Sequence, residues 1–333
     1  MMCCSRDSAC KEVLRSGLEA HQDLRDTIGL LQDLLSVAPI DTQLLLTFGD
    51  EPFTSQVLYS NVPVFHASGS DAFWTIPWPS VYHTRALLSG MLDAEATGEV
   101  EWEKKKPKAW WRGSLIGPST TLLSTASFLP RIRLMSLAAE FPKLFDVALT
   151  GVHATLAHYQ WSSNEVRKLL NRTQTQIQPF QNFWDAARQF KYILIVPGVT
   201  QSHQLSHVLR SGSVPLVVWH TTYEHLFPLM MPWTHYVPVR ADLSDLVSVL
   251  RLLQADDTRA RGIARAASAL AADRLRPTDT YCYLWRAVRA IRDLVDDQAD
   301  VMGGAVQYFT EIPTIDLRRN YSSFRSLRDR LKV

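Results

Sequence analysis

Three short polar clusters follow apolar runs in this chain, and each carries residue types that can do chemistry. A carboxylate such as Asp50 can take the proton of a hydroxyl while that hydroxyl forms a bond. The Arg112 guanidinium and the Ser114 hydroxyl could hold a phosphate, because a forked donor and a hydroxyl match phosphate oxygens in geometry. The three clusters are Gly49-Asp50-Glu51, Arg112-Gly113-Ser114 and Gly198 to Ser202.

Two further positions could hold an anion at the start of a helix. Arg131 opens a predicted helix, where its charge would add to the positive end of the helix dipole. Arg133 could equally be the residue that points inward. Gly198 permits a tight turn, and Ser202 could cap the helix predicted over 202–210. A pyrophosphate would then rest against the free backbone N–H groups of that helix.

Each of these residues also has a purely structural explanation. Asp50 could cap a turn beside Pro52, since Asp is common in turns, and Glu51 is the local alternative carboxylate. Arg112 could form an ion pair at the surface. Capping alone explains Ser202 without any ligand.

The elements that must position these residues alternate regularly along the later part of the chain. Strands that are apolar throughout and separated by helices indicate a parallel sheet covered on both faces. In such sheets ligands bind beyond the carboxyl ends of the strands. The alternation therefore predicts an α/β fold with the polar clusters at strand ends. The predicted strands are 109–116, 144–150, 192–196, 214–219 and 236–239.

Before this alternation the chain is less regular. An amphipathic helix is predicted over 13–37, and the Pro- and Trp-rich stretch 73–79 is predicted to be an irregular loop. Trp74 and Trp78 in that loop could stack on a sugar ring or line an acceptor cleft, although packing explains each of them as well. The lysine-rich run 104–108 is interpreted as a solvated hinge between domains.

Composition limits the classes to which the chain can belong. Its 333 residues exceed one usual core, so two domains are expected, and a net charge of +2 suggests no nucleic-acid or membrane partner. No apolar run reaches the roughly 20 residues of a transmembrane helix. The four Cys lack paired C-x-x-C motifs, which argues against structural zinc, and the start of the chain lacks the layout of a signal peptide. A disulfide from the N-terminal cluster to Cys282 would imply an oxidising compartment; that cluster is Cys3, Cys4 and Cys10.

Blocks spread over residues 41–290 match, in order, the motifs of one known family. The segment 109–114 is similar to a W/F-R-G-S signature, and 131–150 to an Arg-led helix followed by a strand. The stretch 191–246 carries the longest series of matches. Phe48 to Pro52 resembles a short D-x-P turn, and Asp279 to Trp285 a closing Cys-Tyr-x-x-W. These motifs resemble those of the protein O-glucosyltransferases, glycosyltransferase family 90.

The resemblance implies a GT-B fold, an α/β protein of two Rossmann-like domains that face each other across a cleft. It divides the chain into an acceptor-side domain over 1–107, a nucleotide-sugar-binding domain over 108–275, and helices over 276–333 that pack back on the first domain. The implied activity is transfer of glucose or xylose from a UDP-sugar to a hydroxyl of a protein or glycan. The implied enzyme needs no metal or other cofactor and works in the secretory pathway.

The resemblance also assigns roles to single residues. Asp50 would be the catalytic base, and Glu224 would bind ribose hydroxyls unless it simply faces solvent. Trp74 and Trp78 would serve as the acceptor or sugar platform. The remaining nucleotide-sugar-binding positions would be Arg112, Ser114, Arg131, Gly198, Ser202 and Gln204.

One of these positions departs from the family pattern. The family helix begins S-x-R and its Arg contacts the UDP phosphates, whereas this chain has Gln204 there. Losing a charge-assisted hydrogen bond of about 1.5–3 kcal/mol would weaken donor binding roughly 10- to 100-fold. His203, His207 or Arg210 could supply a cation instead, and a nearby acidic family position is Ile132. The alternative function is therefore a catalytically impaired nucleotide-sugar-binding relative. A dehydrogenase or epimerase would carry G-x-G-x-x-G after a strand, and this chain has no such run.

Overall fold

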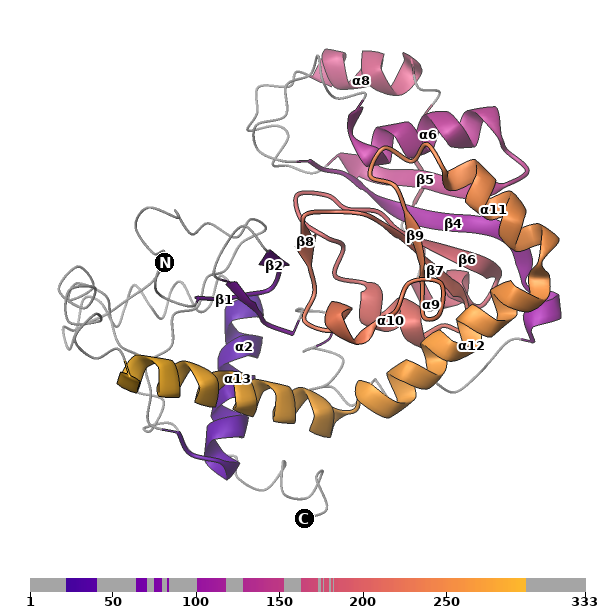
Figure 1. Ribbon diagram of the computed structural model, residues 1–333. Helices are drawn as coiled ribbons and strands as arrows, with labels where there is room; N and C mark the ends of the chain where they lie inside the picture. The colour runs from indigo at the N-terminus through magenta and orange to yellow at the C-terminus, as the bar shows by residue number, and fades with distance from the viewer. Residues whose placement is uncertain are drawn as a thin grey trace. The chain divides into compact units, whose positions relative to one another are not determined.

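The computed structural model describes the chain in segments that divide into two compact units (Figure 1). The larger unit contains the described residues from 101 to Leu275, and the smaller unit those before residue 90 together with those from Arg276. Asp50, Glu51 and Trp74 lie outside the described residues. The described residues are 22–40, 64–70, 75–79, 83, 101–117, 128–152, 163–172, 175, 177–179, 181 and 183–297.

The larger unit is built on a sheet of parallel strands in the order β5-β4-β6-β7-β9 (Figure 1). The prediction of an α/β fold with a parallel sheet is confirmed. Because the strands run the same way, their carboxyl ends lie along one edge of the sheet. The strands are β4 Lys106–Leu115, β5 Phe145–Val152, β6 Phe190–Ile195, β7 Val214–Val218 and β9 Val237–Val239, and a short β8, Thr222–Tyr223, follows β7.

Side chains alternate between the two faces of this sheet and form two hydrophobic layers. Trp111 and Leu194 belong to one layer, whereas Trp110 and Ile193 belong to the other, as the period of two in a strand requires. Helices α6 and α11 cover the first layer, α9 and α10 the second, and α12 contributes to both. The helices are α6 Pro130–Glu140, α8 Ser163–Arg172, α9 Phe183–Ala187, α10 Leu205–Arg210, α11 Leu246–Ala255 and α12 Asp257–Arg274, with single turns η1 Trp102–Lys104 and η3 Phe227–Leu229.

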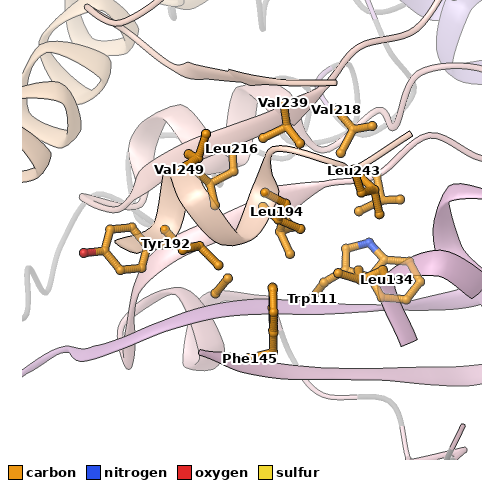
Figure 2. Packing of buried hydrophobic residues seen from close by; sticks show 14 of the residues in the cluster. Trp111, Leu134, Phe145, Tyr192, Leu194, Leu216, Val218, Val239, Leu243 and Val249 are labelled. Carbon is orange, nitrogen blue, oxygen red and sulfur yellow. The ribbon is translucent and has the colours of Figure 1, made fainter. Parts of the chain in front are cut away.

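The first layer holds the centre of the sheet in register (Figure 2). Leu194 and Leu216 on neighbouring strands are almost completely buried, and Trp111 packs in the same cluster as Leu134 of α6. Burying a side chain of this size contributes about 1.5–3 kcal/mol each. This packing gives the strand ends a rigid base.

The interpretation of the lysine-rich run as a solvated hinge is wrong for Lys105. This side chain is only 4% exposed. Its Nζ donates to the carbonyls of Ser211 and Gly212 at 3.0 and 2.9 Å and to Ser213 Oγ at 2.9 Å. Gly212 has a φ of 65°, a left-handed conformation that glycine adopts without strain. Lys105 therefore fixes the start of β4 to the turn before β7, and the next residue already begins a strand.

The smaller unit contains α2 (Gln22–Val37), β1 (Val64–His66), β2 (Gly69–Ser70), β3 (Thr75–Pro77) and α13 (Pro277–Asp297). Strands β1 and β3 pair in parallel, so part of the stretch predicted as an irregular loop is a strand. Within this unit the Tyr283 hydroxyl of α13 donates to the Pro77 carbonyl at 2.6 Å, and His83 Nε2 lies 2.9 Å from Thr280 Oγ1. Residues before 90 thus contact α13.

Trp78 belongs to the core of the smaller unit. Its side chain is 4% exposed and meets the Phe65 ring edge to face, with the ring centres 5.2 Å apart. A ring that serves as a sugar platform must present an open face. The structure therefore supports the packing explanation for Trp78.

Candidate functional site at the carboxyl edge of the sheet

Arg131 joins the carboxyl ends of β4 and β6. Its Nη1 donates to the Ser114 carbonyl at 2.7 Å, its Nε to the Pro197 carbonyl at 3.1 Å, and its Nη2 to the Val196 carbonyl at 3.2 Å. The guanidinium also lies over the Trp111 ring, 5.4 Å from its centre. Carbonyl oxygens and an aromatic face orient a guanidinium without removing its positive charge. Of the two arginines considered for this role, Arg131 is the one that reaches the strand ends.

Gly198 fits closely against this arginine. A Cβ at this position would lie 2.7 Å from Ile116 Cγ2 and 3.0 Å from Arg131 Nη2. The first distance is shorter than Cβ contacts in proteins, and the second is tighter than most of them. The absence of a side chain therefore lets the loop after β6 rest on the guanidinium, which brings together three residues predicted from the sequence: Ser114, Arg131 and Gly198.

Arg112 is held away from such a role by an ion pair. Its Nη2 lies 2.5 Å from Asp146 Oδ1, and its Nη1 donates to the Asp146 carbonyl at 2.8 Å. The Arg112 side chain is 9% exposed. The ion pair that was the structural alternative for Arg112 is present, although with a buried rather than a surface arginine. A phosphate at Arg112 would have to compete with the Asp146 carboxylate.

The loop between β6 and α10 differs from the prediction in where the helix begins. Helix α10 starts at Leu205, with Gln204 as its N-cap and no capping hydrogen bond from a side chain of that residue. Ser202 therefore does not cap the helix. The Leu205 N–H donates instead to Glu224 Oε1 at 3.3 Å, and Glu224 is fully buried. The first N–H of α10 thus already has an internal acceptor, so it is not free to bind a pyrophosphate.

Glu224 is consequently explained without a ligand. The solvent-facing alternative is wrong, because the side chain has no exposed surface. Its contact with the Leu205 N–H positions α10 against the turn after β7. No sequence pattern signals this contact, since the two residues are 19 positions apart.

Of the residues that could replace the missing family arginine, His207 is neutral and Arg210 is hydrogen-bonded to another part of the chain. Burial, together with the charge of Arg210, lowers the pKa of His207 to about 4, so this imidazole is neutral near pH 7. Arg210 donates to the Leu275 carbonyl at the end of α12. Arg131 is therefore the cation that the structure places at the ends of β4 and β6.

The structure adds residues at this edge that the sequence did not single out. The Gln201 N–H donates to Thr222 Oγ1 at 2.9 Å, and Gln201 Nε2 donates to the Val218 carbonyl at 3.3 Å. His220 Nδ1 lies 2.9 Å from the same Thr222 oxygen. Trp219, directly after β7, is 61% exposed. The sequence pattern that indicates these residues is an apolar strand followed at once by aromatic and polar residues.

The described residues offer neither a metal site nor a membrane-spanning helix. They contain no group of three or more His, Cys, Asp or Glu side chains placed to hold a metal ion. None of the helices within the described ranges is long and apolar enough to cross a membrane. Cys282 is exposed and forms no disulfide among the described residues; its predicted partners lie outside them.

Comparison with known proteins identifies relatives over most of the chain. The sequence model described as Glycosyl transferase family 90 matches residues 20–320. Protein O-glucosyltransferase 2 of Danio rerio is 28% identical over 300 residues, covering 87% of this chain and 55% of that protein. Protein O-glucosyltransferase 3 of Homo sapiens is 24% identical over 274 residues, covering 79% and 49%. The chain spans about half the length of these curated relatives. The crystal structure of Anabaena Alr3699/HepE in complex with UDP-glucose aligns with a TM-score of 0.39 and 10% identity over 62% of this chain and 53% of that one.

Proposed function

The chain belongs to glycosyl transferase family 90, and on this premise we propose that it transfers glucose or xylose from a UDP-sugar to a hydroxyl of a protein or glycan acceptor. The curated relatives that match it are protein O-glucosyltransferases by name. In this reaction the acceptor oxygen bonds to the anomeric carbon of the sugar while the bond from that carbon to UDP breaks. The acceptor loses its proton and UDP leaves as the anion.

The observation that supports this proposal is the position of Arg131. Its guanidinium lies between the carboxyl ends of β4 and β6, directly under the backbone of Gly198. Charge develops on the pyrophosphate as the sugar leaves, and a preorganised cation in a site shielded from water stabilises that charge. Ser114 is the next-to-last residue of β4, and its hydroxyl would add a donor to a phosphate oxygen. We therefore assign the pyrophosphate to the Arg131 side of the sheet edge.

Asp50 remains the proposed catalytic base. It would accept the proton of the acceptor hydroxyl as the new glycosidic bond forms, as a carboxylate in general base catalysis does. Ser202 and Gln204 remain proposed donor contacts, because their side chains make no hydrogen bond within the described part of the loop after β6.

A second candidate is a family member that binds the nucleotide-sugar weakly and does not transfer it. The observation that favours it is the neutral His207 beside a Gln at position 204, where the family has an arginine. On this hypothesis the variant Gln204→Arg would bind UDP more tightly than the wild type. The active transferase requires instead that Arg131, together with the uncharged donors around it, suffices for the phosphates.

The test combines binding and turnover on the purified chain. UDP binding would be measured by calorimetry, and sugar transfer by release of UDP from UDP-glucose or UDP-xylose with a serine-containing peptide acceptor. We expect turnover that falls by at least 100-fold in Asp50→Asn while UDP binding is retained, since loss of general base catalysis typically costs that much. Wild-type turnover no higher than that of Asp50→Asn would refute the transferase and favour the hypothesis of a family member that only binds the nucleotide-sugar weakly.

A matched pair of arginines on one helix tests the phosphate assignment. Arg131→Met should weaken UDP binding roughly 10- to 100-fold, because a charge-assisted contact is lost. Arg133→Met removes an equal charge from the same helix, and no hydrogen bond joins Arg133 to the strand ends in the described structure. Equal effects of the two substitutions would contradict a specific phosphate contact by Arg131.

A further inference from the structure

The carboxyl end of β7 presents two ring side chains beside the proposed donor site. Trp219 is 61% exposed although Trp is one of the most buried residue types on average. Its backbone is fixed, because its N–H donates to the Val239 carbonyl at 2.8 Å. The ring is therefore held at the sheet edge with much of its surface uncovered, and His220 follows it directly.

Gln201 ties this end of β7 to the loop that contains Gly198. Its side-chain amide donates to the Val218 carbonyl and its backbone N–H donates to Thr222 Oγ1. Strands β6 and β7 are paired, with Ile195 opposite Val217. Paired strands lie about 4.8 Å apart. Trp219 and the loop after β6 are therefore neighbours along the edge, within the length of a nucleoside diphosphate.

The hydrogen bonds around His220 determine which ring nitrogen carries the proton. The Thr222 N–H donates to His220 Nδ1 at 3.1 Å, so Nδ1 must present a lone pair. Thr222 Oγ1 accepts from the Gln201 N–H and lies 2.9 Å from the same Nδ1, so both the backbone and the side chain of Thr222 contact this nitrogen. The proton of the neutral imidazole is then on Nε2, which makes no hydrogen bond within the described residues. Burial lowers the pKa of His220, which favours this neutral form.

We propose that Trp219 and His220 form the nucleobase end of the donor site, with the indole stacked on the base and the His220 Nε2–H donating to a base carbonyl oxygen. This assignment rests on the proposed function, since it presumes a UDP-sugar whose phosphates lie near Arg131. Thr222 is the positioning residue, because it holds the imidazole in the tautomer that donates from Nε2.

The chemistry of the two rings favours a base over a phosphate or a sugar at this point. A flat base stacks on an aromatic ring, and such stacking is tolerant of base identity. A fixed neutral N–H donor complements an uncharged carbonyl oxygen and adds selectivity for a pyrimidine that carries one. A phosphate would be better matched by a cation. Arg131 supplies that cation at the ends of β4 and β6, and β6 is the strand next to β7.

The binding test compares UDP with inorganic pyrophosphate. We expect Trp219→Ala to weaken UDP binding roughly 10- to 100-fold and Trp219→Phe to keep most of it, since stacking survives in a smaller ring. His220→Ala should weaken UDP binding roughly 10-fold. Pyrophosphate binding should be unchanged in all three variants. His235→Ala is the matched control, because His235 Nδ1 also accepts a backbone N–H, from Met231 at 3.0 Å, but in the loop before β9.

The positioning role of Thr222 has a readout that needs no ligand. Nitrogen-resolved NMR of the imidazole should show the proton of His220 on Nε2 in the wild type, in Thr222→Ser and in Thr222→Val, because all three keep the backbone N–H that donates to Nδ1. UDP affinity should be kept in Thr222→Ser and fall in Thr222→Val, which loses the contact of Oγ1 with the ring. A proton on Nδ1 in the wild type would overturn the assignment of His220.

The outcomes separate this inference from the proposed function. Normal UDP binding that neither Trp219→Ala nor His220→Ala changes would overturn the base site and leave the transferase intact. A rise in acceptor KM without loss of UDP affinity would likewise overturn it, by placing the acceptor on Trp219. A wild-type chain that binds no UDP would overturn both, whereas UDP binding that depends on Trp219 without any sugar transfer would support the base site and refute the transferase.

Discussion

Substituting Gly198 by Ala adds one methyl group at the point where β4, β6 and α6 converge. The new carbon would lie 2.7 Å from Ile116 Cγ2 and 3.0 Å from Arg131 Nη2, and ordinary contact begins near 3.4 Å. Ile116 is β-branched and its side chain is stiff. Arg131 is held by three carbonyls, so it cannot retreat without losing hydrogen bonds. The loop after β6 must therefore shift.

The expected cost is that of overpacking a close contact, about 1–3 kcal/mol of the free energy of unfolding. Because the shift moves the backbone above the Arg131 guanidinium, UDP affinity should also fall, by roughly 10-fold. Urea denaturation measures the first effect and calorimetry with UDP the second. Gly151→Ala is the matched control, since a Cβ there would meet no atom within 4 Å.

A double-mutant cycle tests the physical cause of this effect. Ile116→Ala removes the nearest contact, so the double variant with Gly198→Ala should be more stable than the sum of the two single changes predicts, by about 1 kcal/mol. Additive costs would mean that the Ile116 contact is not the reason. If Gly198→Ala matched Gly151→Ala in both stability and UDP affinity, the close fit of this loop on Arg131 would be refuted.

Three further predictions concern stability. The pKa of His207 in the folded state is about 4, below its ordinary value of 6.5, so protons bind preferentially to the unfolded chain. The contribution of His207 to stability is therefore fully present above pH 6.5, and the free energy of unfolding should fall by about 2 kcal/mol as the pH drops to about 5. Urea titrations at the two pH values should find a smaller loss in His207→Gln. Lys105→Met leaves three acceptors without this donor, two of them partly buried and one buried, and should cost about 2–4 kcal/mol. Lys108→Met, at an exposed hydrogen bond, should change the urea midpoint little. Tyr192→Phe removes a buried hydroxyl that has no hydrogen-bond partner among the described residues, so thermal unfolding should show unchanged or slightly higher stability, and a loss of about 1 kcal/mol or more would contradict this.

The parallel sheet could be predicted because its signal is local. The strand β6 is buried at every position, and its run of apolar residues is visible without any knowledge of neighbouring elements. Arg131 and Gly198 could be predicted for the same reason, since each stands at the boundary between an apolar run and a helix or loop. The carboxyl ends of parallel strands lie along one edge of the sheet, so these boundaries come together there.

Contacts between distant parts of the chain could not be predicted in this way. Lys105 lies in a run of lysines that is typical of solvated segments, and only the turn at Ser211 to Ser213, more than 100 residues later, explains its burial. Ser202 carries the local signature of a helix cap, yet Glu224 supplies the carboxylate from the turn after β7. Local propensity predicts which residue types can cap a helix, whereas tertiary structure determines which residue does so.

Because Glu224 and not Ser202 binds the start of α10, the glutamine at position 204 has a different consequence for phosphate binding. If the start of α10 were an open anion site, an arginine there would hold the phosphates directly and its loss would be severe. The buried carboxyl group of Glu224 already accepts from the first N–H of α10, so that N–H is not free for a second acceptor. Our assignment instead puts the phosphates on the other side of the loop, where Arg131 lies against Gly198. In that arrangement Gln204 is at the margin of the donor site, and its lost charge costs less than the full value of a charge-assisted hydrogen bond.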